Sequence, residues 1–257
     1  MMRPANLVWL AGSLLVTVFV LAAWQWIANH GYVSKVFLPG PDRAWAALVR
    51  DYGSGKLFTE VGETVLRMVF GWLVASVIGI ALGAAIGISP LARTWIAPSL
   101  ELIRPLPASA IAPVAIVFLG MTDNMILLLI AFGSVWPMLL TTIHGFSNVH
   151  PRLDEVARVL RFNSFERVYK IALPAAMPDI IAGLRLGLTI ALILTVVGEM
   201  ITVQGGLGSR ILLAARAFRA PDIFAGVIML GLVGLVTNIA LTALERRLLR
   251  WQPAPAA

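Results

Sequence analysis

The chain contains no cysteine, only three histidines, and only 13% charged residues among its 257 residues. Without cysteine it can form no disulfide, no cysteine-based zinc site, no iron–sulfur cluster and no thiol nucleophile. His30, His144 and His150 are scattered and match no metal-binding spacing such as H-E-x-x-H. P-loop and G-x-S-x-G motifs are also missing. We therefore expect no catalytic residue, no metal site and no cofactor bound by this chain, and nothing in the sequence by itself indicates an enzyme.

Apolar residues dominate what is present: 59% of the chain is hydrophobic and the mean hydropathy is +0.88. Soluble globular proteins are about 45–50% apolar and about 25% charged, so this composition excludes an ordinary soluble domain. It also excludes a disordered protein, which needs low hydrophobicity and high charge. The net charge of +7 is best explained by basic cytoplasmic loops beside anionic membrane lipid, rather than by a nucleic-acid partner. The sequence therefore predicts an all-α membrane protein.

The apolar runs predict six transmembrane helices in a single domain covering residues 1–257, since each span needs roughly 20 apolar residues. We expect them at about 7–28, 61–88, 106–120, 125–145, 180–203 and 223–244. A cleaved signal peptide is the alternative for the first run, but Trp24 and Trp26 stand where a small-residue cleavage site belongs. With six spans and the N-terminus inside, inner segments hold eleven basic residues and outer segments seven, so both termini are expected in the cytoplasm.

The segments between the spans have their own expected roles. Residues 29–60 are expected to be an outer loop with a short surface helix, 148–178 a cytoplasmic loop, and 204–221 an outer loop. Ser89 to Thr94 is expected to be a short loop, and Pro105, Pro107 and Pro113 forbid a straight helix in the third span. Broken backbone at membrane depth is tolerated only against protein or a water-filled cavity.

Two local pairings are predicted in the second span. Small residues recur every four positions, which lets another helix approach closely in lipid. These residues are Gly71, Ala75, Gly79, Gly83 and Gly87. Near the start of the span, Glu63 and Arg67 are spaced for an ion pair between successive turns.

The polar segment 148–178 has the spacing of two short helices. Leu153, Val156 and Leu160 fall on one face of the first; Phe165, Val168 and Tyr169 fall on one face of the second. Asn163 and Glu166 have the spacing of a capping box, and Pro174 and Pro178 are expected to end the second helix. Such a helix pair either docks onto a soluble partner or packs back onto its own bundle, and the pattern alone favours neither.

The same segment resembles the EAA loop of binding-protein-dependent ABC import permeases. That signature is Glu-Ala-Ala, three residues, Gly, nine residues, then Ile-x-Leu-Pro, and this chain matches it at Glu155, Ala157, Ile171, Leu173 and Pro174. Val156 replaces the first Ala conservatively, and Arg161 replaces the Gly. Glycine permits a left-handed turn there, which costs another residue about 1 kcal/mol or more. Because asparagine tolerates that conformation, we expect Asn163 to supply the turn instead.

Other segments are similar to the nitrate/sulfonate/taurine branch of these permeases. They are Phe37–Pro41, Glu101–Pro107, Gly183–Arg185, Val197–Met200 and Gly206–Gly208. The resemblance implies a type I importer permease in the bacterial cytoplasmic (inner) membrane, which moves a small oxyanion by alternating access. It also implies a second copy of the chain, two cytoplasmic ATPase subunits that bind ATP and Mg, and a periplasmic or lipid-anchored solute-binding protein. The positions that it assigns to ATPase coupling are Glu155, Val156, Ala157, Arg158, Arg161, Leu173 and Pro174.

Ionisable residues within the spans are candidates for the substrate path, because each costs at least about 2.5–3.5 kcal/mol to insert. They are Glu101, Arg104, Arg185 and Glu199. Either arginine can attract an oxyanion. Structural roles are the alternative: Arg185 near the cytoplasmic interface, and Glu101 paired with Arg104 one turn away. Glu199 is expected near an outer gate with Gly206 and Gly208.

Two other classes of membrane protein compete with the importer hypothesis. A stand-alone secondary transporter or channel is expected to show inverted repeats and buried ion-coordinating residues, and the sequence shows neither. A membrane-anchored interaction protein has no need of a broken third helix.

Overall fold

The computed structural model describes residues 4–32, 34 and 37–251 of the chain, and every regular element within these ranges is helical. The long helices are α1 (Pro4–His30), α3 (Lys56–Ile88), α6 (Asp123–Ser147), α9 (Leu173–Thr202) and α11 (Ala220–Leu248). The shorter helices are α2 (Pro41–Gly53), α4 (Pro90–Ile103), α5 (Ala112–Leu119), α7 (Pro151–Val159), α8 (Ser164–Arg167) and α10 (Gly206–Arg216). A 3-10 turn covers Ala108–Ile111, and a π-helical turn covers Val168–Ala172.

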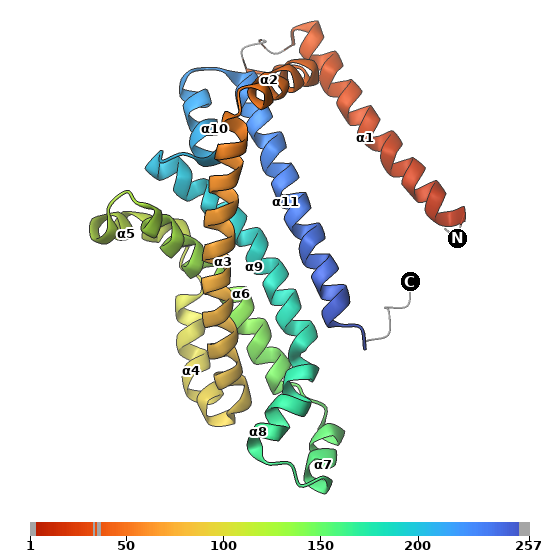
Figure 1. The fold of residues 1–257 in the computed structure, drawn as a ribbon, viewed down its shortest axis with the longest axis vertical. Helices are drawn as coiled ribbons and strands as arrows, with labels where there is room; N and C mark the ends of the chain where they lie inside the picture. The colour runs from red at the N-terminus through yellow and green to blue at the C-terminus, as the bar shows by residue number, and fades with distance from the viewer. Residues whose placement is uncertain (1–3, 33, 35–36, 252–257) are drawn as a thin grey trace.

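Five helical segments are long and apolar enough to cross a membrane. A sixth span forms if α4 and the segment Ala108–Leu119, which are bent by 77° relative to each other, count as one. This agrees with the prediction of an all-helical protein with a proline-broken third span. Figure 1 shows α3, α6, α9 and α11 running along the long axis, with α2 and α10 near one end and α7 and α8 at the other. On which side of the membrane the termini lie stays a prediction.

The stripe of small residues on α3 packs against α6, as the sequence predicted. A Cβ atom on Gly79 would lie 2.9 Å from Met138 Cβ, and one on Gly83 would lie 2.7 Å from Thr142 Cβ. Such distances are too short for any side chain, so the glycines allow the two backbones to approach. Core side chains such as Met138 are completely buried on the facing helix. The close contact between α3 and α6 therefore depends on the absence of a Cβ atom at these glycines.

Two segments expected to be loops are helical. α4 begins at Pro90, immediately after Ser89, whose hydroxyl accepts a hydrogen bond from the Ala92 N–H at 3.2 Å. Serine at the N-cap followed by proline is a helix-start signal, so the loop expected at 89–94 is wrong. The glycine-rich stretch after residue 204 also contains a helix, α10, in which Leu207, Ile211 and Ala214 form a buried face. Burial of this face outweighs the unfavourable helix propensity of the neighbouring glycines.

The fifth long helix reaches farther than the sequence suggested. Residues 164–202 form one continuous helical segment, with the π-helical turn between α8 and α9. Pro174 follows shortly after the π-helical turn, and Pro178 lies inside α9, so neither proline ends the helical segment. The expectation that these prolines separate a loop helix from the fifth span is therefore wrong. The second helix of the 148–178 loop and the far end of α9 therefore belong to one continuous helical segment.

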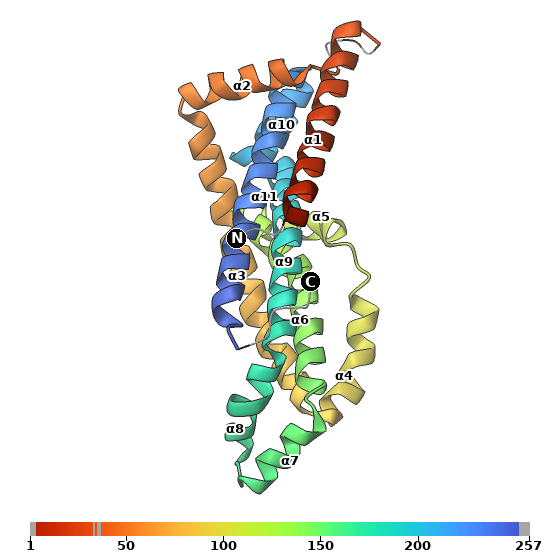
Figure 2. The same ribbon diagram turned by 90° about the vertical axis from the view of Figure 1, so that its right-hand side faces the viewer.

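The first helix, α1, stands apart from the others over most of its length (Figures 1 and 2). It joins the rest of the molecule near its C-terminal end, where the Trp24 indole donates a hydrogen bond to the Pro39 carbonyl at 3.0 Å. The Trp24 ring also lies 5.2 Å from the ring of Phe224 on α11. Along the rest of α1, Trp9 and the side chains of residues 12–22 are exposed, as expected for a helix surrounded by lipid.

Candidate functional site

The segment with the EAA-like spacing forms the end of the molecule opposite to α2 and α10 (Figures 1 and 2). α7 and α8 both lie beyond the ends of α3 and α6 there. Several of their apolar side chains have no cover: Val159 is 81% exposed, and Phe165 is 77% exposed. We call this set the loop surface; its members are Leu153, Val156, Val159, Leu160, Phe165 and Tyr169. Of the two predicted faces, only Val168 packs onto the chain's own bundle, against the core around Phe146 and Ala176, while the residues of the loop surface do not.

The turn between α7 and α8 is made by Arg161, which has a left-handed backbone with φ of 52°. Asn163 has φ of −74° and ψ of 170°, so the expectation that Asn163 supplies the left-handed turn is wrong. The Phe162 N–H bonds to the Ala157 carbonyl at 2.9 Å, and the Arg161 N–H bonds to Arg158 at 3.1 Å. This is the hydrogen-bond pattern that normally ends a helix at a glycine. Arginine therefore occupies the glycine position of the signature without changing its geometry.

Asn163 instead begins α8 through the predicted capping box. Its side chain accepts the Glu166 N–H at 2.8 Å, and the Glu166 carboxylate accepts the Asn163 N–H at 3.1 Å. Lys170, one turn farther on, donates to Glu166 at 2.8 Å and lies 4.8 Å from the centre of the Phe162 ring. These contacts hold the second loop helix in place without any partner protein.

The residues predicted for coupling divide into exposed and buried groups. Glu155, Val156, Arg158 and Arg161 are exposed on α7 and the turn after it. Ala157 is buried, with 3% of its surface exposed. Leu173 and Pro174 are half-buried at the start of α9, where Leu173 packs on a small core around Phe146 and Ala176. The first group can touch a partner, and the second anchors the loop to the bundle.

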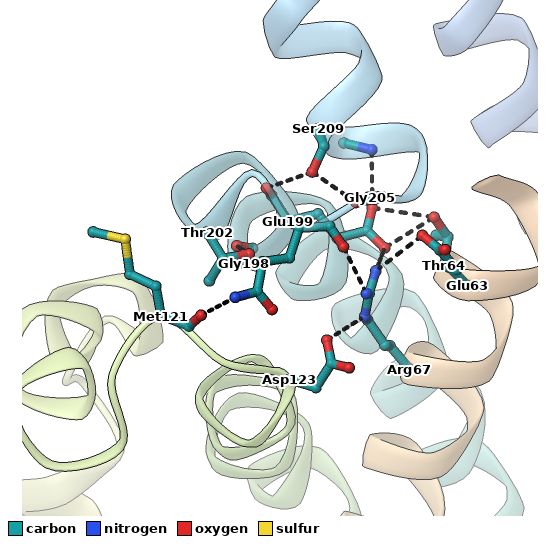
Figure 3. A network of polar contacts seen from close by, with 12 residues as sticks. Glu63, Thr64, Arg67, Met121, Asp123, Gly198, Glu199, Thr202, Gly205 and Ser209 are labelled. Atoms are coloured by element: carbon teal, nitrogen blue, oxygen red, sulfur yellow. Dashed lines mark hydrogen bonds and ion pairs between the residues drawn. The ribbon is translucent and has the colours of Figure 1, made fainter.

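A buried polar network lies near the opposite end of α9, centred on Glu199 (Figure 3). The Glu199 side chain is completely buried and accepts hydrogen bonds from three donors, two on α3 and one on α10. Thr64 on α3 donates at 3.0 Å, Arg67 on α3 donates at 3.1 Å, and the Gly208 N–H donates at 2.9 Å. A buried carboxylate is tolerated when its charge is paired and its oxygens are hydrogen-bonded, as they are here.

Arg67 connects this carboxylate to two further segments. Its Nε donates to Asp123 at the start of α6 at 2.9 Å, and one of its terminal nitrogens donates to the Gln204 carbonyl at 2.9 Å. The predicted pairing with Glu63 is present at 3.9 Å, which makes it the longest of the Arg67 ion pairs. Sequence reasoning missed the others because it gave Arg67 a partner on its own helix. Arg67 lies within a predicted span, and a charged residue there is costly to insert. The same argument that selected Glu199 would therefore have selected Arg67.

Gly206 and Gly208 lie directly against Glu199. A Cβ atom on Gly206 would overlap the Glu199 carboxylate, and one on Gly208 would lie 2.9 Å from Glu199 Cβ. Gly206 also has φ of 82°, which other residues rarely adopt. The structure thus brings together the three residues that the sequence placed near an outer gate; their role as a gate stays a prediction.

The other three candidates for the substrate path lie elsewhere. Arg185 forms an ion pair with Glu245 on α11, so it has a partner within the chain. Glu101 and Arg104 are both exposed, and no ion pair joins them within residues 37–251. Arg104 follows α4 and lines a pocket between α6 and α9. Any contact of these residues with substrate stays a prediction.

A second ionic cluster ties down the end of the molecule that holds α2 and α10. Arg210 on α10 pairs with Glu60 at 2.8 Å and with Asp51. Arg50 on α2 pairs with Asp222 at the start of α11. The hydrogen bond to Asp222 is the main cause that raises the pKa of Arg50 above its ordinary value. Together these pairs join α2, α3, α10 and α11.

Comparison with known proteins identifies the family. Residues 75–250 match the family described as binding-protein-dependent transport system inner membrane component. The putative aliphatic sulfonates transport permease protein SsuC of Bacillus subtilis is 35% identical over 244 residues, covering 95% of this chain and 88% of that protein. The taurine transport system permease protein TauC of Escherichia coli is 27% identical, covering 90% and 86%. The nitrate import permease protein NrtB of Leptolyngbya laminosa is 27% identical, covering 85% and 80%.

Among solved structures, an inward-facing MetNI methionine ABC transporter shares the fold. Its TM-score is 0.66 at 17% identity, covering 75% of this chain and 96% of that one. These relatives do not favour a stand-alone secondary transporter or channel. The chain belongs to the family of binding-protein-dependent transport system inner membrane components, and it is a multi-pass permease subunit of an ABC importer in the inner membrane.

Proposed function

We propose that two copies of this chain form a pathway for a small oxyanion, driven by two separate cytoplasmic ATPase subunits that bind ATP and Mg. A solute-binding protein delivers the anion to the end that holds α2 and α10. The names of the relatives support this substrate class, since aliphatic sulfonates, taurine and nitrate all carry oxygen-rich anionic groups. The proposal leaves ATP chemistry entirely to the partner subunits.

The observation that carries the proposal is the loop surface. Exposed apolar side chains at the tip of a water-facing loop are costly unless a partner covers them. The apolar face is flanked by the exposed charges of Glu155 and Arg158, which can set the orientation of a partner. We infer that α7 and the turn at Arg161 dock into a groove of the ATPase.

The continuous helical segment 164–202 supplies the mechanical link. At about 1.5 Å per residue, the part of this segment that runs from Ser164, beside the loop surface, to Glu199 is roughly 50 Å long. A displacement of the loop by the ATPase therefore moves the same rod that carries the Glu199 network. In this proposal the network, with Gly206 and Gly208, forms the outer gate, and ATP-driven movement of the loops alternates access between the two ends.

The test is complex formation with the neighbouring ATPase in detergent. Glu155→Arg reverses a charge that flanks the loop surface and is expected to reduce recovery of the complex at least tenfold. Asp42→Arg makes the same change on exposed α2 at the opposite end and is expected to leave recovery unchanged. If Glu155→Arg binds the ATPase as well as the wild type does, the docking surface is wrongly assigned, whereas the family membership stands.

A further inference from the structure

A pocket of about 430 Å³ lies between α6, α9 and the chain that follows α4. Its lining includes Gly133 and Trp136 from α6 and Ile193 and Leu194 from α9. Arg104, at the proline-rich break, lies at its edge. This volume falls in the range of about 300–1,000 Å³ typical of small-molecule sites.

The pocket lies at membrane depth. Gly133 and Trp136 occupy the middle of α6, which runs from Asp123 to Ser147. Ile193 and Leu194 fall well inside α9. Non-helical backbone at this depth, such as the chain between α4 and the turn at Ala108, is tolerated where it lines a cavity. The broken third span and the pocket are thus two aspects of one arrangement.

Arg104 is the only charged residue in the lining of this pocket. Within the described part of the chain its guanidinium has no carboxylate partner, unlike Arg67, Arg185 and Arg210. An unpaired arginine within a membrane is expensive, and such residues mark ion or substrate pathways. The remaining side chains are almost all apolar, including Ile193, Leu194 and the Trp136 ring.

Trp136 adds a latent hydrogen-bond donor. Its indole Nε1 is buried without an acceptor within the described residues. Buried tryptophan N–H groups normally have a partner.

We propose that this pocket is the transit site for the imported anion, and that it selects an organic oxyanion with a short apolar tail. The headgroup lies against Arg104, and the tail lies against Ile193 and Leu194. The inference rests on the proposed function and makes it more specific: alkanesulfonates fit a site with one cation and apolar walls, whereas nitrate has no tail to fill it.

The test uses the complete complex, permease with its ATPase, in proteoliposomes with the solute-binding protein. Uptake of ethanesulfonate, hexanesulfonate and nitrate is measured together with ATP hydrolysis. Arg104→Gln is expected to lower sulfonate uptake at least tenfold while binding-protein-stimulated ATP hydrolysis changes less than twofold. Arg247→Gln, an exposed arginine near the end of α11 and outside the pocket, is the matched control and is expected to behave as wild type. Ile193→Trp narrows the apolar part and is expected to lower hexanesulfonate uptake more than ethanesulfonate uptake.

The outcomes separate the two proposals. Wild-type sulfonate uptake that Arg104→Gln and Ile193→Trp leave unchanged overturns the pocket assignment and leaves the importer function intact. Uptake of nitrate without any sulfonate overturns the organic substrate class. A permease that forms no complex with the ATPase, or a wild-type complex that imports no oxyanion at all, overturns the proposed function itself.

Discussion

Arg67 on α3 and Glu199 on α9 form an ion pair at 3.1 Å although 132 residues separate them in the chain. The carboxylate is completely buried and the arginine side chain is 11% exposed. The same guanidinium reaches Asp123 and the Gln204 carbonyl, so one side chain joins α3, α6, α9 and the segment before α10. The end of the subunit near α10 is therefore held together by charge as well as by apolar packing.

Replacing Glu199 tests the strength of this pair. Glu199→Ala leaves Arg67 partly buried without its main partner and leaves the Gly208 N–H unpaired, so we expect a loss of about 3–5 kcal/mol in unfolding free energy. Asp123→Asn removes a second carboxylate partner of Arg67, one that is 60% exposed, and is expected to cost about 0–1 kcal/mol. Denaturant unfolding of the purified permease in detergent measures both. Equal losses in the two variants would contradict the central position of Glu199.

The space at Gly206 is already occupied by the Glu199 carboxylate. Gly206→Ala is therefore expected to lower the thermal unfolding midpoint, through both the clash and the left-handed backbone. Gly62→Ala is the matched control, because a Cβ there meets nothing within 4 Å on a helix. Alanine favours a helix by about 1 kcal/mol over glycine, so this control is expected to raise the midpoint slightly. An unchanged unfolding midpoint in Gly206→Ala would mean that the Glu199 carboxylate can move aside.

Close packing between α3 and α6 predicts a similar contrast. A Cβ at Gly79 lies 2.9 Å from Met138 Cβ and 3.1 Å from the Val135 carbonyl, so Gly79→Ala must push the helices apart. We expect about 1–3 kcal/mol of destabilisation, typical of overpacking a core. Gly231→Ala on α11 adds a methyl group into open space and should not destabilise the protein. The two variants are compared by their unfolding midpoints. A Gly79→Ala midpoint equal to that of the wild type would show that α3 and α6 are not closely packed at this position.

Replacing Arg161 is expected to stabilise the turn between α7 and α8 rather than to weaken it. Its left-handed backbone costs a non-glycine residue about 1 kcal/mol, so Arg161→Gly is expected to slow amide hydrogen exchange in residues 157–163. Asn163→Gly makes the same change two residues later, where the backbone is extended and the side chain caps α8. That variant is expected to speed exchange in α8. Faster exchange in Arg161→Gly would indicate that the arginine side chain holds the turn by contacts of its own.

The sequence by itself determined the features that depend on local pattern. Apolar runs identified the membrane class, and the four-residue spacing of small residues on α3 identified the face that packs. The capping box at Asn163 depends only on residues three positions apart, so it too was readable. The spacing from Glu155 to Pro174 indicated the family from side-chain identities alone.

Tertiary structure decided the features that depend on residues far apart in the chain. Periodicity shows which face of a helix is apolar but not which helix it meets, so the partners of Arg67 on α6 and α9 were out of reach. Arg161 adopts a left-handed turn because hydrogen bonds on both sides of it close the end of α7. The helix at α10 forms in a glycine-rich stretch because its apolar face is buried and Glu199 binds the N–H of Gly208. At α10, packing and hydrogen bonds from elsewhere in the fold outweigh a local preference of the order of 1 kcal/mol, whereas the hydrogen bonds that close the turn at Arg161 come from α7 itself.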